Sequence, residues 1–322
     1  MKAIQISETG GPEVLKLVEL PIPEPGPGQV LIRIEATGVN FVEVYFRKGV
    51  YKAALPLIPG SEAAGTIEEL GPGVTGFAAG DAVASTSVMG SYAEYALVPA
   101  AQLVKVPEGL SLESAAAVML QGMTAHYLAY STFPLKSGET ALVHAGAGGV
   151  GLLLTQIAAH IGARVITTVS TPAKAELSHE AGASDVILYT EQDFEAEVKR
   201  LTAGKGVDVV YDSVGKTTFE KSLNCLHPRG MMVLFGASSG PVPLFDLQQL
   251  NSKGSLFITR PSMWHYIATR AELEWRSGDV LNWAAKGELK LRMEHTYQLA
   301  EAAQAQTDLE ARKTTGKVLL AP

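Results

Sequence analysis

The sequence predicts an α/β fold in which a doubly wound parallel sheet, with helices on both faces, accompanies a second domain rich in β structure. From residue 140 to residue 259, short apolar runs alternate with helical stretches, which is typical of parallel strands joined by crossover helices. Residues 1–107 instead contain short alternating runs, such as residues 30–35, broken by Gly and Pro. A glycine-rich turn at residues 146–151 links the first parallel strand to a helix.

Composition is ordinary for a globular protein of two domains. The chain has 322 residues, 47% hydrophobic and 18% charged, and no apolar run approaches the roughly 20 residues that span a bilayer. The net charge of −7 argues against broad binding to nucleic acid or to an anionic membrane. The single cysteine, Cys225, excludes an internal disulfide framework, and we expect it to be a small buried hydrophobe. Because residues 1–6 alternate like a strand and no secretory h-region follows, we expect a cytoplasmic protein.

The β-rich part begins with this strand-like segment at residues 1–6. The proline-glycine cluster at residues 21–28 lacks the N–H donors of an interior strand and is predicted to be a surface connection. Residues 38–49 concentrate polar and aromatic side chains. Between residues 112 and 130 the composition shifts to Ala, Met and Leu, which favours a helix and indicates a domain boundary near Gly122.

The glycine turn carries the clearest functional signal. A strand at residues 140–144 runs into Gly146, Gly148 and Gly151, which match G-x-G-x-x-G. In this pattern one glycine permits the tight turn, one lets a pyrophosphate approach the backbone, and one lets helix and strand pack closely. Apolar residues recur at helical spacing over residues 150–161, so the unpaired N–H groups of a helix start face the turn. The pattern predicts a nucleotide site, and a glycine-rich connection without a ligand is the alternative.

The alternation of strands and helices continues toward the chain's last third. Further strands are predicted at residues 164–169, 186–189, 207–212, 231–235 and 255–259. Helices are predicted between them at residues 173–181 and 194–201. Six strands joined by crossover helices imply a parallel sheet that is covered on both faces. The chain ends in a helical stretch at residues 299–307 and a strand at residues 317–320, which we expect to return to the first domain.

Five segments together carry a family resemblance: Gly38 to Phe41, Ala145 to Gly151, Val210 to Gly215, Phe235 to Gly240 and Thr259 to Ser262. In this order they resemble the zeta-crystallin-like quinone oxidoreductases of the medium-chain dehydrogenase/reductase superfamily, and the likeness covers nearly the whole chain. The resemblance implies a GroES-like substrate/catalytic domain made of residues 1–122 and 256–322. It also implies a Rossmann NADPH-binding domain of residues 123–255, a cofactor cleft between the two, and a homodimer paired through the edge strand at residues 255–259.

The same resemblance implies the cofactor contacts. The backbone at Gly148, Gly149 and Val150 would hold the pyrophosphate. Other contacts to the nucleotide would come from both domains, at Asn40, Thr124, Tyr127, Ser213, Phe235, Ser238 and Arg312. For Asn40 and Ser213, a turn-capping role is the alternative.

The sequence also predicts activity without a metal. Zinc-dependent members of the superfamily carry a Gly-His-Glu segment near the site and a lobe with four cysteines. Here the matching segment is Gly60-Ser61-Glu62, and there are no cysteines for a lobe. The seven histidines, including His126 and His144, show no ligand pairing at short spacing, so we expect them to be structural.

The segment after the second parallel strand predicts NADPH as the cofactor. An NAD-preferring site ends this strand with Asp or Glu, which accepts hydrogen bonds from the ribose 2′-hydroxyl. Here the strand runs into Ser170, Thr171, Pro172 and Lys174 with no acid, and hydroxyls with an ammonium would hold a 2′-phosphate. The resemblance assigns phosphate contacts to Ser170, Lys174 and Tyr189. In the alternative, Ser170 and Thr171 cap a helix, Pro172 is an early helical residue and Lys174 is a solvated side chain.

Four residues are candidates for the catalytic set. No Ser-His-Asp or Cys-His arrangement is evident, so the cofactor must carry the chemistry. Asn40, Tyr45, Arg47 and Tyr51 are expected near the acceptor, with Asn40 at the nicotinamide end. Tyr45 is able to donate a hydrogen bond or a proton, whereas Arg47 either stabilises an anionic intermediate or forms a surface salt bridge. Two more residues either line the pocket or simply pack: Met89 and Trp264.

The expected activity is the NADPH-dependent reduction of quinones. Enals or enones are the alternative acceptors, because quinones and enones are both conjugated carbonyl systems. Transfer of a hydride and transfer of single electrons both stay open. An alternative from another class is a cofactor-binding protein with a structural or RNA-binding role, as in some relatives of this kind, and the acidic balance disfavours the RNA version.

Overall fold

The computed structural model describes all residues from Met1 to Pro322 and divides them into two compact units. Unit 1 consists of Met1–Met123 and Thr269–Pro322, and unit 2 consists of Thr124–Ala268. The sequence-based division placed residues 256–268 in the first domain. The structure places them in unit 2, because the strand that begins at Phe257 pairs with the parallel sheet of that unit. None of the helices combines the length and the apolar character needed to cross a bilayer.

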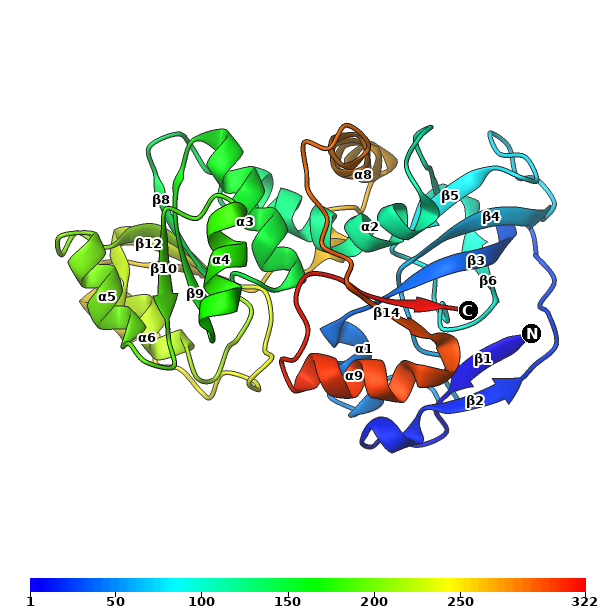
Figure 1. Cartoon of the computed structure of the whole chain (residues 1–322), viewed down its shortest axis with the longest axis horizontal. Helices are drawn as coiled ribbons and strands as arrows, with labels where there is room; N and C mark the ends of the chain where they lie inside the picture. The colour runs from blue at the N-terminus through cyan, green and yellow to red at the C-terminus, as the bar shows by residue number, and fades with distance from the viewer. The chain divides into compact units, whose positions relative to one another are not determined.

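Unit 2 is built on a six-stranded sheet in which every pairing is parallel, as predicted (Figure 1). The strand order is β10-β9-β8-β11-β12-β13. The strands are β8 (Thr140–His144), β9 (Arg164–Val169), β10 (Asp185–Leu188), β11 (Val207–Asp212), β12 (Leu226–Leu234) and β13 (Phe257–Thr259). β13 begins two residues later than predicted, because Ser255 has a φ of 56°, which a strand does not accommodate.

Helices cover both faces of this sheet. They are α3 (Gly149–Ile161), α4 (Pro172–Glu180), α5 (Phe194–Leu201), α6 (Phe219–Asn224) and α7 (Gln248–Ser252). Figure 1 shows α3 and α4 on one side of the strands and α5 and α6 on the other, the arrangement that right-handed crossovers produce. The core beneath α5 and α6 includes Leu142, Val210 and Phe194. Cys225 is fully buried in this core, as predicted.

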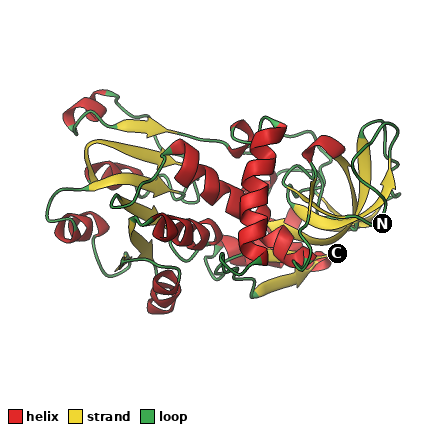
Figure 2. Cartoon of the chain, turned by 90° about the horizontal axis from the view of Figure 1, so that it is seen from above, coloured by secondary structure: helices red, strands yellow, loops and turns green.

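Unit 1 is rich in β structure (Figure 2). Its main sheet has the order β14-β15-β3-β4-β5-β7, β6 pairs with β3, and β1 pairs with β2 separately. The strands are β1 (Lys2–Gln5), β2 (Lys16–Glu19), β3 (Gln29–Val39), β4 (Ala63–Leu70), β5 (Ala82–Ser85), β6 (Tyr95–Pro99), β7 (Val104–Lys105), β14 (His295–Gln298) and β15 (Val318–Ala321). β15 pairs with β3, with Val318 opposite Val39, so the last strand of the chain returns to the first domain as expected.

Four α-helices begin in unit 1: α1 (Phe41–Arg47), α2 (Leu112–Tyr127), α8 (Arg270–Ala285) and α9 (Ala302–Glu310). α2 continues into a π-helical turn, Leu128–Thr132. Short 3-10 turns lie at Pro12–Val14, Ala100–Gln102, Met263–His265 and Leu299–Glu301. Val39 and Val318 are both buried in one apolar cluster of unit 1, which fixes the end of β3 against the start of β15.

Candidate active site

The glycine turn after β8 has the geometry of a dinucleotide-binding turn. A Cβ atom at Gly151 would collide with the carbonyl oxygen of Ala145, and one at Gly146 would lie 2.6 Å from Thr167 Cβ. These two glycines are therefore required by close packing. Gly148 is the N-cap of α3, and a Cβ there would meet only the Ala145 oxygen, at 3.2 Å. A Cβ at Gly148 would therefore be tight but would not collide, and a phosphate at the helix start stays the predicted reason for this glycine.

The carboxyl edge of the parallel sheet collects predicted cofactor residues of unit 2. Ser170 follows β9, Tyr189 follows β10, Ser213 follows β11 and Phe235 follows β12. Because these strands run parallel, their carboxyl ends meet along one edge, which is where open α/β sheets bind ligands. The hydroxyl of Thr190 donates a hydrogen bond to the Ser170 carbonyl at 3.0 Å, so the ends of β9 and β10 are tied together.

A buried aspartate shapes the turn that carries Ser213. Asp212 Oδ1 accepts hydrogen bonds from the backbone N–H groups of Val214, at 2.7 Å, and Gly215, at 3.0 Å. The Ser213 carbonyl accepts a hydrogen bond from the backbone N–H of Ser238 at 3.1 Å. The structure therefore brings Ser213 and Ser238 together at the carboxyl edge, with Ser238 exposed.

The start of α4 lies directly after β9. Thr171 is its N-cap residue and accepts a hydrogen bond from the backbone N–H of Lys174 at 3.3 Å, and Pro172 is the first helical residue. The capping alternative is thus correct for Thr171 and Pro172. It does not compete with a phosphate role for Ser170 and Lys174, because a helix start carries unpaired N–H groups that favour an anion. The side chains of Ser170 and Lys174 are partly buried.

Thr124 and Tyr127 lie on α2 where the helix belongs to unit 2. Both are buried. Thr124 Oγ1 is 4.0 Å from Met263 Sδ, and the Tyr127 ring stacks on Tyr266 with the centroids 4.4 Å apart. The two predicted cofactor residues therefore contact the segment that follows β13. Between the two contact points of that segment, Trp264 is exposed, so it is not a core residue.

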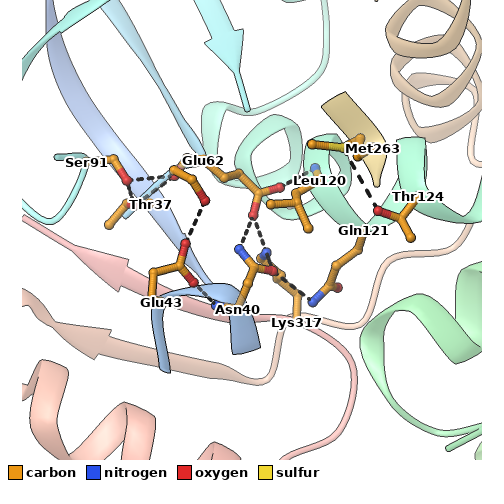
Figure 3. A network of polar contacts seen from close by, with 11 residues as sticks. Thr37, Asn40, Glu43, Glu62, Ser91, Leu120, Gln121, Thr124, Met263 and Lys317 are labelled. Carbon is orange, nitrogen blue, oxygen red and sulfur yellow. Dashed lines mark hydrogen bonds and ion pairs between the residues drawn. The ribbon is translucent and has the colours of Figure 1, made fainter. Parts of the chain in front are cut away.

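Asn40 lies at the start of α1 inside a buried polar network of unit 1 (Figure 3). Its Nδ2 donates a hydrogen bond to Glu62 Oε2 at 3.0 Å, and its Oδ1 accepts one from Lys317 Nζ at 2.9 Å. Glu62 and Lys317 form an ion pair whose side chains are 0% and 3% exposed. The backbone N–H of Asn40 donates to Glu43 Oε2 at 2.7 Å. Asn40 therefore occupies the N-cap position of α1, while its amide is engaged by an ion pair.

Glu43 is a second buried carboxyl in this network. Burial raises the pKa of Glu43 to about 7, although the hydrogen bond from Ser61 and the charge of Lys317 act in the opposite direction. Ser61 Oγ donates to Glu43 Oε1 at 2.6 Å. Ser61 occupies the position at which zinc-dependent members carry histidine, and in this chain its hydroxyl donates a hydrogen bond to Glu43.

Tyr45 and Tyr51 belong to an aromatic cluster on and after α1. Their rings meet edge to face with centroids 5.3 Å apart, and Phe46 lies 5.6 Å from Tyr51 in the same manner. Phe41 lies 6.3 Å from Tyr45. Tyr51 is exposed and Tyr45 is partly buried. The cluster therefore combines aromatic rings with two phenol groups, and its predicted place at the acceptor stays a prediction.

The predicted role of Arg47 at the acceptor is wrong. Its side chain is fully buried, and its guanidinium donates to the Gly10 carbonyl at 3.3 Å and to Gln306 Oε1 at 2.7 Å, with an ion pair to Glu310. A guanidinium enclosed by protein cannot reach a substrate, and the pair is not the surface salt bridge of the alternative either. Because Gln306 and Glu310 lie on α9, Arg47 fastens α1 to that helix.

Two other predicted residues of unit 1 are exposed. Met89 is exposed, so simple packing does not account for it. Arg312 follows α9 with a φ of 61° and is also exposed. Their roles stay predictions.

No group of three or more His, Cys, Asp or Glu side chains is arranged to hold a metal ion. His144 instead makes two buried hydrogen bonds, from Nδ1 with Thr168 Oγ1 and from Nε2 with Ser222 Oγ, both at 2.9 Å. Burial lowers the pKa of His144, so the neutral ring is favoured. This is the structural role that was predicted for the histidines.

Glu62 and Lys317 were missed by reasoning from the sequence. They are 255 residues apart and meet only because β3 pairs with both β4 and β15. One signal was present, since each is a charged residue directly before an apolar strand, at Ala63 and at Val318. A charge at that place is rarely buried unless it is paired.

Comparison with known proteins supports the family resemblance along the whole chain. A family model described as "Alcohol dehydrogenase GroES-like domain" matches residues 26–108, and one described as "Zinc-binding dehydrogenase" matches residues 149–272. A quinone oxidoreductase of Pseudomonas aeruginosa is 45% identical over 100% of this chain and 99% of its own. A 2-haloacrylate reductase of a Burkholderia species is 43% identical over 99% and 98%. The structure of Escherichia coli quinone oxidoreductase complexed with NADPH has a TM-score of 0.98 at 42% identity and covers 100% of both chains.

The GroES-like domain and the parallel sheet with its glycine turn define a medium-chain dehydrogenase/reductase. Identity above 40% over the full length is more specific, and the chain belongs to the quinone oxidoreductase family. The predicted fold class and the family resemblance are thereby confirmed.

Proposed function

We propose that this protein catalyses the NADPH-dependent reduction of quinones. The observation that carries the proposal is the carboxyl edge of the parallel sheet, where a glycine turn, Ser170 and Lys174 suit a dinucleotide with a 2′-phosphate. The Escherichia coli relative is named a quinone oxidoreductase and was solved with NADPH, and its likeness covers the whole chain. This similarity supports both the cofactor and the acceptor.

The residues of unit 2 would hold the cofactor. Gly148, Gly149 and Val150 open α3 and offer backbone N–H groups to a pyrophosphate. Ser170, Lys174 and Tyr189 would contact the 2′-phosphate, and no acid follows β9 to repel it. The remaining contacts would come from Thr124, Tyr127, Ser213, Phe235 and Ser238, with Asn40 and Arg312 from unit 1. Bound NADPH would supply the reducing electrons, while the protein binds and orients the reactants.

Unit 1 would supply the contacts to the acceptor. With Arg47 enclosed by protein, the predicted catalytic set is reduced to Asn40, Tyr45 and Tyr51, and each tyrosine carries a phenol hydroxyl. A phenol hydroxyl stabilises a carbonyl oxygen that gains negative charge as the quinone is reduced. The overall reaction converts one quinone, one NADPH and one proton into hydroquinone and NADP⁺.

A second acceptor class is supported by one relative. The Burkholderia enzyme is named for the reduction of a 2-haloacrylate, which is a conjugated carboxylic acid. Enals and enones share this conjugation, so the aromatic cluster and the tyrosines would also suit them. Conjugated carbonyl compounds are therefore the second candidate substrates.

The direct test is oxidation of NADPH and of NADH, followed by absorbance, with a panel of quinones, enals, enones and 2-haloacrylate. We expect turnover with NADPH and quinones, and we expect it to survive dialysis against a strong chelator. Activity confined to the conjugated acids or enones would favour the second candidate. Tight binding of NADPH without turnover on any acceptor would support the cofactor-binding structural or RNA-binding alternative, and zinc-restored activity would refute the metal-independent proposal.

The cofactor part is tested with Lys174→Ala. A hydrogen bond to a charged group contributes about 1.5–3 kcal/mol, so NADPH should bind roughly ten- to a hundredfold more weakly while NADH is unaffected. Lys205→Ala is the matched control, because Lys205 is exposed and precedes β11 at the opposite edge of the sheet. An equal loss for both cofactors, or none for NADPH, would remove Lys174 from the specificity site.

We also propose a homodimer in the cytoplasm. β13 is the last strand of its sheet and Phe257 is 55% exposed, so the edge is open to pairing with a second copy. A single cysteine, fully buried, suits a reducing compartment. Phe257→Lys should shift the sedimentation of the protein toward a monomer, and an unchanged mass with an intact fold would count against this interface.

A further inference from the structure

The side chain of Asn40 is enclosed by two partners of opposite charge. Lys317 carries only hydrogen-bond donors, and its Nζ lies 2.9 Å from Asn40 Oδ1. Glu62, when ionised, carries only acceptors, and its Oε2 lies 3.0 Å from Asn40 Nδ2. The oxygen and nitrogen of an amide have nearly the same shape, so only the partners decide which way it points. In the reverse orientation the oxygen would face the carboxylate and the NH₂ group would face the ammonium.

We infer that the buried ion pair of Glu62 and Lys317 is a positioning device that fixes the orientation of the Asn40 amide, so that Asn40 meets the cofactor as a hydrogen-bond donor. The inference rests on the proposed function, which puts Asn40 at the nicotinamide end of NADPH. Glu62 takes one of the two hydrogens on Nδ2, and the other has no partner in the protein. The oxygen is already engaged by Lys317, with Gln121 Nε2 at 3.5 Å as a distant second donor. What Asn40 has left to offer is therefore an N–H.

The fold holds the two charges firmly around Asn40 (Figure 3). The other oxygen of Glu62 accepts a hydrogen bond from the backbone N–H of Leu120 at 2.5 Å. The backbone N–H of Lys317 donates to the Arg292 carbonyl at 2.8 Å. Both charges therefore have their own anchors, independent of the amide that lies between them.

Gly38 makes room for the pair. A Cβ atom at this position would collide with the Glu62 carboxylate and would crowd the Lys317 ammonium. Gly38 is not in the left-handed region, so the glycine is needed for space rather than for its backbone conformation. The glycine of the Gly38-Val39-Asn40 segment is thereby explained by the ion pair that holds Asn40.

Stability alone does not explain this pair. Taking two charges out of water costs about as much as their attraction returns, and apolar residues of similar volume often fill such a site as well or better. A buried charge pair is better explained by what it specifies, and here it specifies the direction of one amide.

The test uses a double substitution that removes both charges and keeps the volume, Lys317→Met with Glu62→Gln. The amide introduced at position 62 keeps an oxygen for the Leu120 N–H and turns its NH₂ group toward Asn40, which favours the reverse orientation. NADPH should bind about tenfold more weakly than to wild type. The same double substitution made together with Asn40→Ala should change the dissociation constant less than about twofold relative to Asn40→Ala alone.

An equal loss of affinity for NADPH when the double substitution is made in wild type and in Asn40→Ala would show that the ion pair acts only on the structure. That result would overturn the inference. The matched control is Lys105→Met with Asp81→Asn, which removes an ion pair of the same unit that does not touch Asn40. It should leave the affinity for NADPH unchanged in both backgrounds. A loss of affinity in the control as large as in the test variant would also overturn the inference.

A second measurement reads the amide without the cofactor. The chain has four asparagines, so selective ¹⁵N labelling gives four NH₂ signals, and Asn40→Ala assigns the one of interest. In the wild-type protein the Asn40 hydrogen that is bonded to Glu62 should exchange with solvent at least about tenfold more slowly than the hydrogens of the exposed Asn251 and Asn282. It should exchange faster in the double variant and not in the control.

The outcomes separate the two claims. Exchange of the Asn40 signal as fast as the two exposed asparagines, or an unchanged signal in the double variant, would overturn the positioning role whatever the enzyme does. Wild-type protein that neither binds NADPH nor oxidises it with any acceptor would overturn the proposed function, even where the NMR result is as expected.

Discussion

Two buried carboxylates, Asp212 in unit 2 and Glu62 in unit 1, are compensated in different ways. Asp212 accepts hydrogen bonds from the backbone of Val214 and Gly215 and, at 2.7 Å, from the hydroxyl of Thr218. A fourth and longer hydrogen bond, at 3.4 Å, comes from the hydroxyl of Ser222. All of these partners are neutral, and all lie within ten residues of Asp212. The partners of Glu62 lie 22, 58 and 255 residues away, and the most distant one is a lysine.

The difference shows what each carboxylate does. Asp212 is satisfied by its own turn, so it shapes that turn and with it the position of Ser213. Glu62 is satisfied by three separate segments, so it joins them and fixes Asn40 where they meet. A carboxylate with many local donors tolerates the loss of one. A carboxylate that depends on a single distant cation does not.

Lys317→Met is the sharpest way to break this comparison. The substitution leaves the Glu62 carboxylate buried without its cation, which costs about 3–5 kcal/mol in similar cases. We expect the free energy of unfolding, measured with urea at pH 7, to fall by that amount. Adding Glu62→Gln should recover most of the loss, because the uncompensated charge is then removed.

The control for this prediction is Lys105→Met. Lys105 pairs with Asp81 at 2.8 Å, but its side chain is 58% exposed, so water replaces the lysine. Its loss of stability should be far smaller. If Lys317→Met costs no more than Lys105→Met, Glu62 does not depend on its distant cation and the comparison fails.

The same contrast explains how much of the molecule was predictable from the sequence. The bounds of β9, β11 and α5 match the prediction, because the apolar residues within each segment determine them, as short runs in the strands and at helical spacing in α5. The residues proposed to bind the cofactor at the carboxyl edge were predicted from the strand ends and the family pattern. These signals are local, as are the partners of Asp212.

What the sequence did not reveal depends on segments that meet only in the fold. Arg47 was expected near the acceptor, because nothing close to it in the chain indicates its partners Gln306 and Glu310. Lys317 is next to an apolar strand, but its pairing with Glu62 requires that β15 lie beside β3. Side-chain pairs between distant segments carry no periodic signal, so single-sequence reasoning misses them.

Glu43→Gln sharpens the comparison through the dependence of stability on pH. The pKa of Glu43 is about 7 in the folded protein, above its ordinary value of 4.5, mainly because the carboxyl is buried. Between these two pH values the folded protein keeps a proton that the unfolded chain releases, so stability falls as the pH rises. The contribution of Glu43 is fully present below pH 4.5 and is lost as the pH passes 7.

Because glutamine does not titrate, the stability of Glu43→Gln relative to wild type should rise by about 3 kcal/mol between pH 4 and pH 8. Urea denaturation at several pH values measures this difference. The control is Glu24→Gln, because Glu24 is exposed, and its stability relative to wild type should not change with pH in this way. If the stability of Glu43→Gln relative to wild type does not change across this pH range, Glu43 is ionised throughout. The charge of Lys317 would then compensate both buried carboxylates of unit 1, Glu43 and Glu62.

Asp212→Asn should have the smallest effect of the three. The new amide keeps an oxygen that accepts from the N–H groups of Val214 and Gly215, and its NH₂ group faces the hydroxyl of Thr218, which is able to turn and accept. Only the extra strength of hydrogen bonds to a charged group is lost, so the free energy of unfolding should fall by about 1–2 kcal/mol. Because the turn stays formed, the position of Ser213 should change little, and the dissociation constant for NADPH should stay within about threefold of wild type. Asp212→Ala, which removes both carboxylate oxygens, should lower the free energy of unfolding and the affinity for NADPH further. If Asp212→Asn instead destabilises the protein as much as Lys317→Met, donors in the local turn compensate a buried carboxylate no better than a lysine 255 residues away.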